Sequence, residues 1–261
     1  MQRKKYGKSN YIHVVDKDIQ LSASDVLSSW TNNTFSFPEE EYHQGKGFRK
    51  PQRGALYAIK AHWTVSKDVA TIVMPTGTGK TEVMIATVVS ERIKKVCIIV
   101  PSKMLQKQTI KRFSTLGKLF DIGAIDNSFK EPIIGCLNAS PDNLSDLTAL
   151  INDSNIIVTT MALLNSKKFQ APFLELLARE CDTLIIDEAH HLPAKSWQRI
   201  KKQFEATRCL QFTATPFRND GKKIDGDIIY NFPLALAQEQ GYFKPINFYA
   251  VHEFDDSKKD L

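Results

Sequence analysis

The chain has 261 residues, 42% of them hydrophobic and 25% charged, which suits one large or two smaller folded domains and argues against extensive disorder. Its net charge of +6 fits a phosphate-rich partner such as nucleic acid, although many unrelated soluble proteins are mildly basic. No apolar run approaches the roughly 20 residues of a membrane span, and no signal peptide is recognisable, so we expect a soluble, cytoplasmic protein without a membrane partner.

The four cysteines do not form a metal-binding pattern. None belongs to a CxxC pair, and no histidine lies at zinc-finger spacing from any of them. Cys97 and Cys209 lie in apolar stretches and are predicted to be buried thiols.

The first 47 residues are the least regular part of the sequence. They are polar and include an acidic run at positions 39–41. A short helix is predicted over Ser24–Trp30, with Ser22 or Ser24 as its N-cap. We interpret residues 1–47 as an N-terminal extension or a small accessory element.

Residues 48–245 alternate between strand-like and helix-like segments. Short apolar runs predict strands that are buried on both faces: Ala70–Met74, Val96–Val100, Asn155–Thr159, Thr183–Ile186 and Leu210–Phe212. Helical spacing occupies the segments between them: Thr81–Ile93, Leu105–Phe113, Leu144–Ile151 and Pro172–Ala178. This alternation predicts an α/β fold, a parallel sheet covered by helices on both faces, with ligands bound where the strands end.

A phosphate-binding loop follows the first of these strands. The segment 74–81 reads MPTGTGKT, which matches the P-loop pattern except that Met74 replaces its first glycine. Glycines let successive backbone N–H groups point at one anion, and the N-terminus of the next helix adds to that field. The candidate nucleotide-binding residues are Pro75, Thr76, Gly77, Thr78, Gly79, Lys80 and Thr81. Lys80 is expected to reach the β- and γ-phosphates, and the Thr81 hydroxyl to ligate Mg²⁺.

Two adjacent carboxylates end the strand Thr183–Ile186. Asp187 is placed to hold Mg²⁺ beside Thr81, and Glu188 to accept a proton from the attacking water. The alternative is an ordinary acidic turn, but carboxylates after a buried strand are costly unless a cation lies near. His190 is expected to sense the γ-phosphate rather than to bind a metal.

This order of segments resembles the motor of superfamily 2 helicases of the DEAD/DEAH type, specifically its N-terminal RecA-like lobe. MPTGTGKT is followed about 110 residues later by DEAH, and weaker motifs fall in the family's order. The resemblance covers about residues 48–245 and implies an ATP- and Mg²⁺-dependent helicase or translocase with Lys80, Glu188 and His190 as its catalytic residues. It also implies roles for Gln52 in reading adenine, for Pro101, Ser102, Lys103 and Thr160 in contacting nucleic acid, and for Thr213, Ala214 and Thr215 in coupling.

The exact residues of two motifs indicate one branch of this superfamily. DEAHHLPA at 187–194 and TATPFRND at 213–220 are similar to the branch that contains the motor subunits of type III restriction enzymes. That branch favours DNA over RNA as the partner. For Thr160 the alternative is an ordinary capping role at the end of its strand.

Motors of this family need a second RecA-like lobe, whose arginines stabilise charge on the transferred phosphate. We expect residues 246–261 to begin a linker or that lobe, and the chain alone, as a fragment, to hydrolyse ATP poorly. The alternatives are the motor of a restriction or defence complex with a nuclease or recruitment partner, an RNA helicase lobe, and an ATP-gated clamp that does not hydrolyse.

Overall fold

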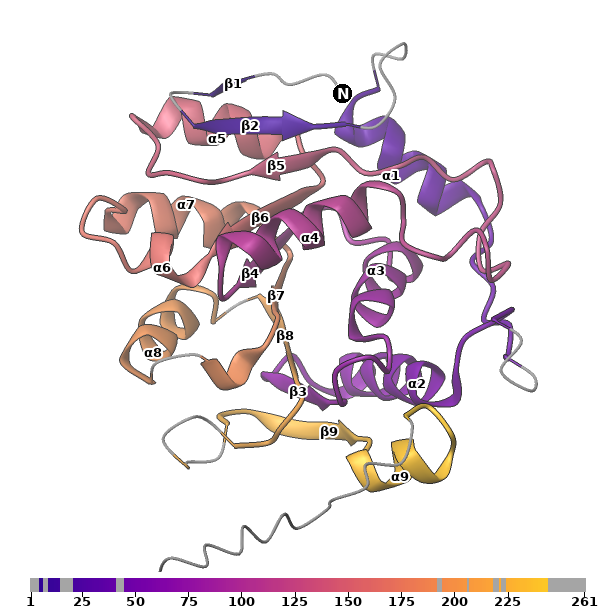
Figure 1. Ribbon diagram of the computed structural model, residues 1–261. Coiled ribbons are helices and arrows are strands. Elements are labelled where there is room, and N and C mark those ends of the chain that lie inside the picture. Colours follow the sequence, from indigo (N-terminus) through magenta and orange to yellow (C-terminus); the bar gives the residue numbers. More distant parts are fainter. Residues whose placement is uncertain are drawn as a thin grey trace, which may run out of the picture.

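A single mixed sheet forms the centre of the molecule in the computed structural model (Figure 1). The structure describes residues 5–6, 9–14, 21–40, 45–191, 194–205, 207–217, 221 and 224–243. The expected start of a second lobe, residues 246–261, lies outside these ranges. Within the described ranges the strands are ordered β1-β2-β5-β6-β4-β7-β8-β3-β9.

The five predicted strands all form, within one or two residues of their expected ends. They are β3 (Ala70–Val73), β4 (Val96–Val100), β6 (Ile156–Thr160), β7 (Thr183–Ile186) and β8 (Arg208–Thr213). They lie next to one another and pair in parallel, so the loops that follow them share one edge of the sheet. Nearly all of their side chains are buried, as expected for strands covered on both faces.

Four further strands were not predicted from the sequence. Two extend the parallel sheet, one beside β6 and one beside β3: β5 (Ile134–Cys136) and β9 (Asp227–Asn231). The other two pair antiparallel at the β5 edge: β1 (Lys5–Tyr6) and β2 (Asn10–His13). The sheet is therefore mostly parallel, which confirms the predicted fold class, and the antiparallel pairing within the described ranges lies at this edge.

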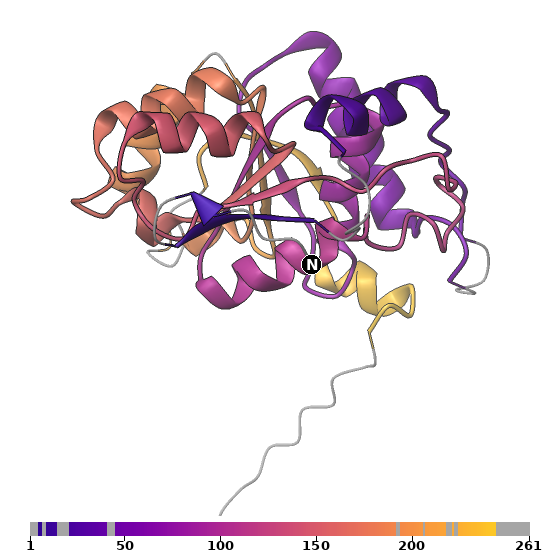
Figure 2. The same ribbon diagram turned by 90° about the horizontal axis from the view of Figure 1, so that it is seen from above.

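Helices cover both faces of the sheet, as predicted (Figures 1 and 2). One group packs around the P-loop: α2 (Lys50–Val65), α3 (Lys80–Ser90) and α4 (Lys103–Ser114). A second group covers the other face: α5 (Leu144–Asn152), α6 (Met161–Leu164), α7 (Ala171–Glu180) and α8 (Ala194–Gln203). The last described helix, α9 (Leu234–Glu239), follows β9. None of the helices in the described ranges has both the length and the hydropathy needed to cross a bilayer.

Helix α3 ends earlier than its apolar pattern predicts. The expected end was Ile93, but Arg92 adopts a left-handed backbone with φ of 53°, which breaks the helical hydrogen bonding. The Ile93 N–H then donates to the Val88 carbonyl at 3.0 Å. Ile93 stays buried beneath the turn. Its apolar side chain therefore indicates a buried position, and it does not indicate that the helix continues to this residue.

The described part of the N-terminal segment is built into the same core. Helix α1 (Ala23–Asn32) has Ser22 as its N-cap, one of the two expected caps. Trp30 is 1% exposed, and its indole N–H donates to the Lys130 carbonyl at 2.9 Å. The domain boundary at residue 47 remains a prediction. All four cysteines are buried, which confirms the expectation for Cys97 and Cys209.

Candidate nucleotide and nucleic-acid site

The P-loop forms a tight turn between β3 and α3. Gly77 and Gly79 have φ of 89° and 97°, values that favour glycine, and Gly79 is the N-cap of α3. The buried Thr78 hydroxyl donates to the Pro75 carbonyl at 2.7 Å and fixes the turn from inside. Met74 is fully buried, and its N–H donates to the Thr213 carbonyl at 2.9 Å, so the residue that replaces the expected glycine continues the sheet.

Helix α2 places Gln52 directly on this loop. Gln52 is 6% exposed, and its side-chain oxygen accepts a hydrogen bond from the Arg49 N–H at 2.9 Å. A Cβ atom at Gly79 would collide with the Gln52 amide nitrogen, so the two residues are in close contact. The structure thus brings the predicted adenine-reading residue against the predicted phosphate loop.

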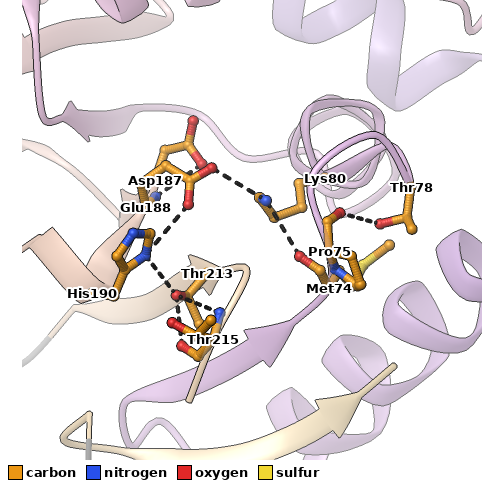
Figure 3. Close-up of polar contacts among 9 residues, drawn as sticks. All are labelled: Met74, Pro75, Thr78, Lys80, Asp187, Glu188, His190, Thr213 and Thr215. Carbon is orange, nitrogen blue, oxygen red and sulfur yellow. Dashed lines mark hydrogen bonds and ion pairs between the residues drawn. The ribbon is translucent and has the colours of Figure 1, made fainter. Parts of the chain in front are cut away.

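Lys80 crosses from the P-loop to the acidic pair (Figure 3). Its ammonium lies 3.2 Å from Glu188 Oε1 and 3.3 Å from the Met74 carbonyl oxygen. The side chain is 7% exposed, so this cation is largely shielded from water. Two segments about 110 residues apart in the sequence therefore meet at one point.

Asp187 and Glu188 follow β7 at the edge where the strands end. Burial, reinforced by the neighbouring Glu188 charge, raises the pKa of Asp187 to about 6 against the attraction of Lys80. Glu188 has a left-handed backbone with φ of 50°, uncommon for a residue with a side chain. Its Oε2 atom is buried and accepts no hydrogen bond, an unsatisfied acceptor of the kind found where a ligand or water is expected.

A chain of polar contacts connects the acidic pair to the end of β8 (Figure 3). His190 Nδ1 lies 3.5 Å from Glu188 Oε2 and 3.0 Å from the Thr213 hydroxyl. The Thr213 hydroxyl also lies 2.8 Å from the Thr215 carbonyl oxygen and accepts from the Thr215 N–H at 3.3 Å. Burial lowers the pKa of His190, which favours its neutral form. The predicted coupling segment is thus in contact with the predicted catalytic segment.

A cavity of about 420 Å³ opens between the P-loop, the acidic pair and α4. Predicted site residues that line it are Gln52, Thr76, Gly77, Gly79, Lys80, Thr81, Asp187 and Glu188. Several other lining residues are not among the predicted site residues: Glu40, Gly45, Gly47, Arg49, Glu82, Leu105, Arg112, Lys118 and Ile122. Phe243 was also not predicted, and its ring lies about 3.3 Å from where a Cβ atom on Gly77 would be. Of these residues, only Glu82, directly after the P-loop, and Leu105, two residues after Lys103, adjoin a predicted motif.

The residues of the cavity fit a magnesium-bound nucleoside triphosphate. The glycine turn and the start of α3 present backbone N–H groups, and Lys80 supplies a shielded positive charge. The raised pKa of Asp187 and the unsatisfied Glu188 oxygen show a cost that a bound divalent cation and its water would relieve. Thr81 and Asp187 are the residues that would hold the metal.

The predicted nucleic-acid contacts differ in accessibility. Ser102 and Lys103 are exposed, and Pro101 is partly exposed, at the end of β4. Thr160 is only 5% exposed, and its hydroxyl caps α6 by accepting from the Leu163 N–H at 3.3 Å. Pro101, Ser102 and Lys103 are therefore accessible from solvent, whereas the Thr160 side chain already has a structural role.

A comparison with protein families matches residues 45–218 to the type III restriction enzyme res subunit family. The match spans more than half of the chain. The chain belongs to this family. This match, together with the P-loop and the acidic pair, identifies it as an N-terminal RecA-like lobe of the superfamily 2 helicase type.

Several characterised proteins are similar to this res-subunit family lobe. The DNA 3'-5' translocase XPB2 of Sulfurisphaera tokodaii is 32% identical over 178 residues, which are 66% of this chain and 34% of that protein. The RNA polymerase-associated protein RapA of Actinobacillus pleuropneumoniae is 27% identical over 240 residues, 78% of this chain and 23% of that protein. The lobe thus spans about a third or less of the length of these relatives.

Among solved structures, the lobe is similar to a nuclease-deletion mutant of the type ISP restriction-modification enzyme LlaGI in complex with a DNA substrate mimic. The TM-score is 0.49 and the identity 18%, over 75% of this chain and 20% of that protein.

Proposed function

We propose that this chain is the ATP-binding and ATP-hydrolysing lobe of a motor that moves along nucleic acid, with DNA favoured over RNA. The observation that carries the proposal is the 3.2 Å contact between Lys80 of the P-loop and Glu188 of the acidic pair, at the wall of a cavity large enough for a nucleotide. The names of the relatives, a DNA translocase among them, support DNA as the partner.

The predicted catalytic and metal-binding residues have separate roles in the proposed reaction. Bound Mg²⁺ would neutralise charge on the phosphates, and Thr81 and Asp187 would hold it. Lys80 would bind the β- and γ-phosphates after exchanging its contact with Glu188 for the nucleotide. Glu188, once released, would accept a proton from the attacking water. His190 and Thr213 would report the state of that site to the end of β8.

The proposed motor needs parts beyond this lobe. We propose that a second RecA-like lobe supplies arginines that stabilise the transferred phosphate, and that a nuclease or recruitment partner uses the movement. The greater length of the similar proteins supports the second lobe, and membership of the restriction res-subunit family supports the nuclease partner. The cytoplasm is the proposed site of action.

Replacement of Glu188 by glutamine tests the hydrolytic role. Because the amide cannot accept the water proton, Glu188→Gln in the full-length protein should lower DNA-stimulated ATP hydrolysis by about 100-fold or more. ATP binding should be retained, since the side-chain size is preserved. The measurements are steady-state phosphate release and the dissociation constant of a fluorescent ATP analogue.

Glu175→Gln is the matched control, because Glu175 is an exposed glutamate on α7, away from the cavity. This variant should hydrolyse ATP at the wild-type rate. Unchanged hydrolysis by the Glu188 variant would contradict its role as the base. Nucleotide binding without any hydrolysis by the full-length wild type would instead support the non-hydrolysing clamp.

A further inference from the structure

Helix α4 forms a wall shared by the nucleotide cavity and the proposed nucleic-acid contact. It begins after its N-cap Ser102, whose hydroxyl accepts a hydrogen bond from the Leu105 N–H at 3.3 Å. Leu105 and Arg112 are seven residues apart, about two helical turns, and so lie on the same face of α4. Both line the nucleotide cavity. One rigid helix therefore runs from the candidate nucleic-acid residues to the nucleotide.

The far end of α4 is joined to the P-loop helix by an ion pair. Arg112 contacts the carboxylate of Glu82, the residue after Thr81. Glu82 is 8% exposed, and a buried carboxylate beside a triphosphate site is unfavourable unless a cation neutralises it. Arg112 is the cation that the described structure places there. Gly117, with φ of 59°, leaves room for this pair, because a Cβ atom there would lie 2.9 Å from Glu82 Oε1.

The first turn of α4 is fixed to the sheet through Gln106. The Gln106 amide donates to the Leu137 carbonyl at 3.2 Å and to the Val158 carbonyl at 2.9 Å, beyond the end of β5 and within β6. Gln106 is 2% exposed, so these hydrogen bonds are shielded from water. The helix is therefore held to the sheet at its first turn, beside Ser102 and Lys103, and to α3 at its last turn, through Arg112.

We propose that the Arg112–Glu82 ion pair couples nucleotide binding to nucleic-acid binding through α4. Nucleic acid bound at Ser102 and Lys103 sets the position of α4. Through its contact with Arg112, the helix then sets the position of Glu82, which is next to the proposed magnesium ligand Thr81. Arg112 and Glu82 are positioning residues in this scheme and do not take part in the chemistry. The inference rests on the proposed function, since it requires both ligands.

The test measures a coupling factor on chain 1–261. This factor is the ratio of the dissociation constants of a fluorescent ATP analogue without and with a saturating DNA oligonucleotide. In the wild type we expect a factor of about fivefold or more, within the usual range of allosteric coupling. In the double variant Glu82→Gln/Arg112→Gln both charges disappear together, so no unpaired charge remains in the cavity. We expect the coupling factor to fall to about one, whatever the change in nucleotide affinity without DNA, because the factor is a ratio within the same variant.

Two further variants separate coupling from general effects on the cavity. Lys118→Ala alters a residue that lines the same cavity but follows α4, so its coupling factor should stay at the wild-type value. Arg112→Lys keeps the positive charge and should retain most of the coupling even if the double variant folds poorly, which a thermal melt would show.

The inference is overturned if the double variant keeps the wild-type factor, or if Lys118→Ala loses as much. It is also overturned if the wild type binds both ligands with a factor of one, a result that leaves the proposed function intact. Failure of the wild type to bind either ligand contradicts the proposed function itself.

Discussion

Several residues of the nucleotide site depend on backbone conformations that side chains disfavour. Gly77, Gly79 and Glu188 all have positive φ, at 89°, 97° and 50°. The glycines adopt this region at little cost, whereas Glu188 is held there by its contacts with Lys80 and His190. Strain of this kind concentrates where a side chain must point at a ligand.

Replacement of Gly79 by alanine should damage binding more than folding. Alanine at positive φ costs about 1–2 kcal/mol of stability, and its Cβ would also displace the Gln52 amide. Gly123→Ala is the control, because Gly123 has φ of 73° but open space around it. We expect similar losses in urea unfolding for both variants, and a loss of nucleotide affinity of about tenfold or more only for Gly79→Ala. Equal affinities for the two variants would contradict the role of this close contact.

At the scale of elements, helix ends and helix anchors position the site. Gly79 starts α3, and Ser102 starts α4, so both helices present their first turns at the edge where the strands end. The same edge carries the acidic pair, because β7 lies between β4 and β8. The buried amide of Gln106 then fixes α4 against the sheet.

Removal of this anchor should lower stability. Gln106→Leu removes a buried donor from the Leu137 and Val158 carbonyls, and we expect the free energy of unfolding to fall by about 1–3 kcal/mol. Gln108→Leu is the control on the same helix, because Gln108 is exposed and should change stability by no more than about 0.5 kcal/mol. Urea unfolding measures both values. A loss for Gln106→Leu as small as that of the control would show that α4 is held by apolar packing alone.

For the molecule as a whole, one end of the sheet carries the candidate nucleotide site and the other end contributes to stability. β3 carries the P-loop near one end, and β1 and β2 close the other end beyond β5. Strand β2 contributes Ile12 to the core and pairs with β5 along its length. Without these strands β5 would become an exposed edge, a known route to aggregation.

Deletion of residues 1–14 should therefore affect stability and solubility but not nucleotide binding. We expect the thermal midpoint to fall by about 4 °C or more, the shift that a loss of about 2 kcal/mol produces in a domain of this size. Light scattering should rise with protein concentration. Because five strands separate β2 from β3, nucleotide affinity should stay within about twofold of wild type. A large loss of nucleotide affinity with a normal melting temperature would contradict this division.

The buried strands and the helices between them were predictable because each carries its own periodic signal. The strands β5 and β9 were not. β5 has three residues and includes Gly135, and β9 is partly exposed with polar ends, so neither gives the apolar run of a central strand. The antiparallel pairing of β1 and β2 could not be predicted from the sequence either, because short edge strands form through their neighbours and not through their own composition.

The sequence by itself determined the chemical groups and their order: the glycine turn with Lys80 and Thr81, the strand that ends in Asp187 and Glu188, and the segment from Thr213 to Thr215. These are local patterns, in which each residue type performs its task through the backbone next to it. Only the tertiary structure decided which distant residues share the cavity. Arg112 and Glu82 are in contact because α3 and α4 pack side by side. Packing between two segments does not produce a periodic pattern in the sequence of either one, so this contact could not be predicted.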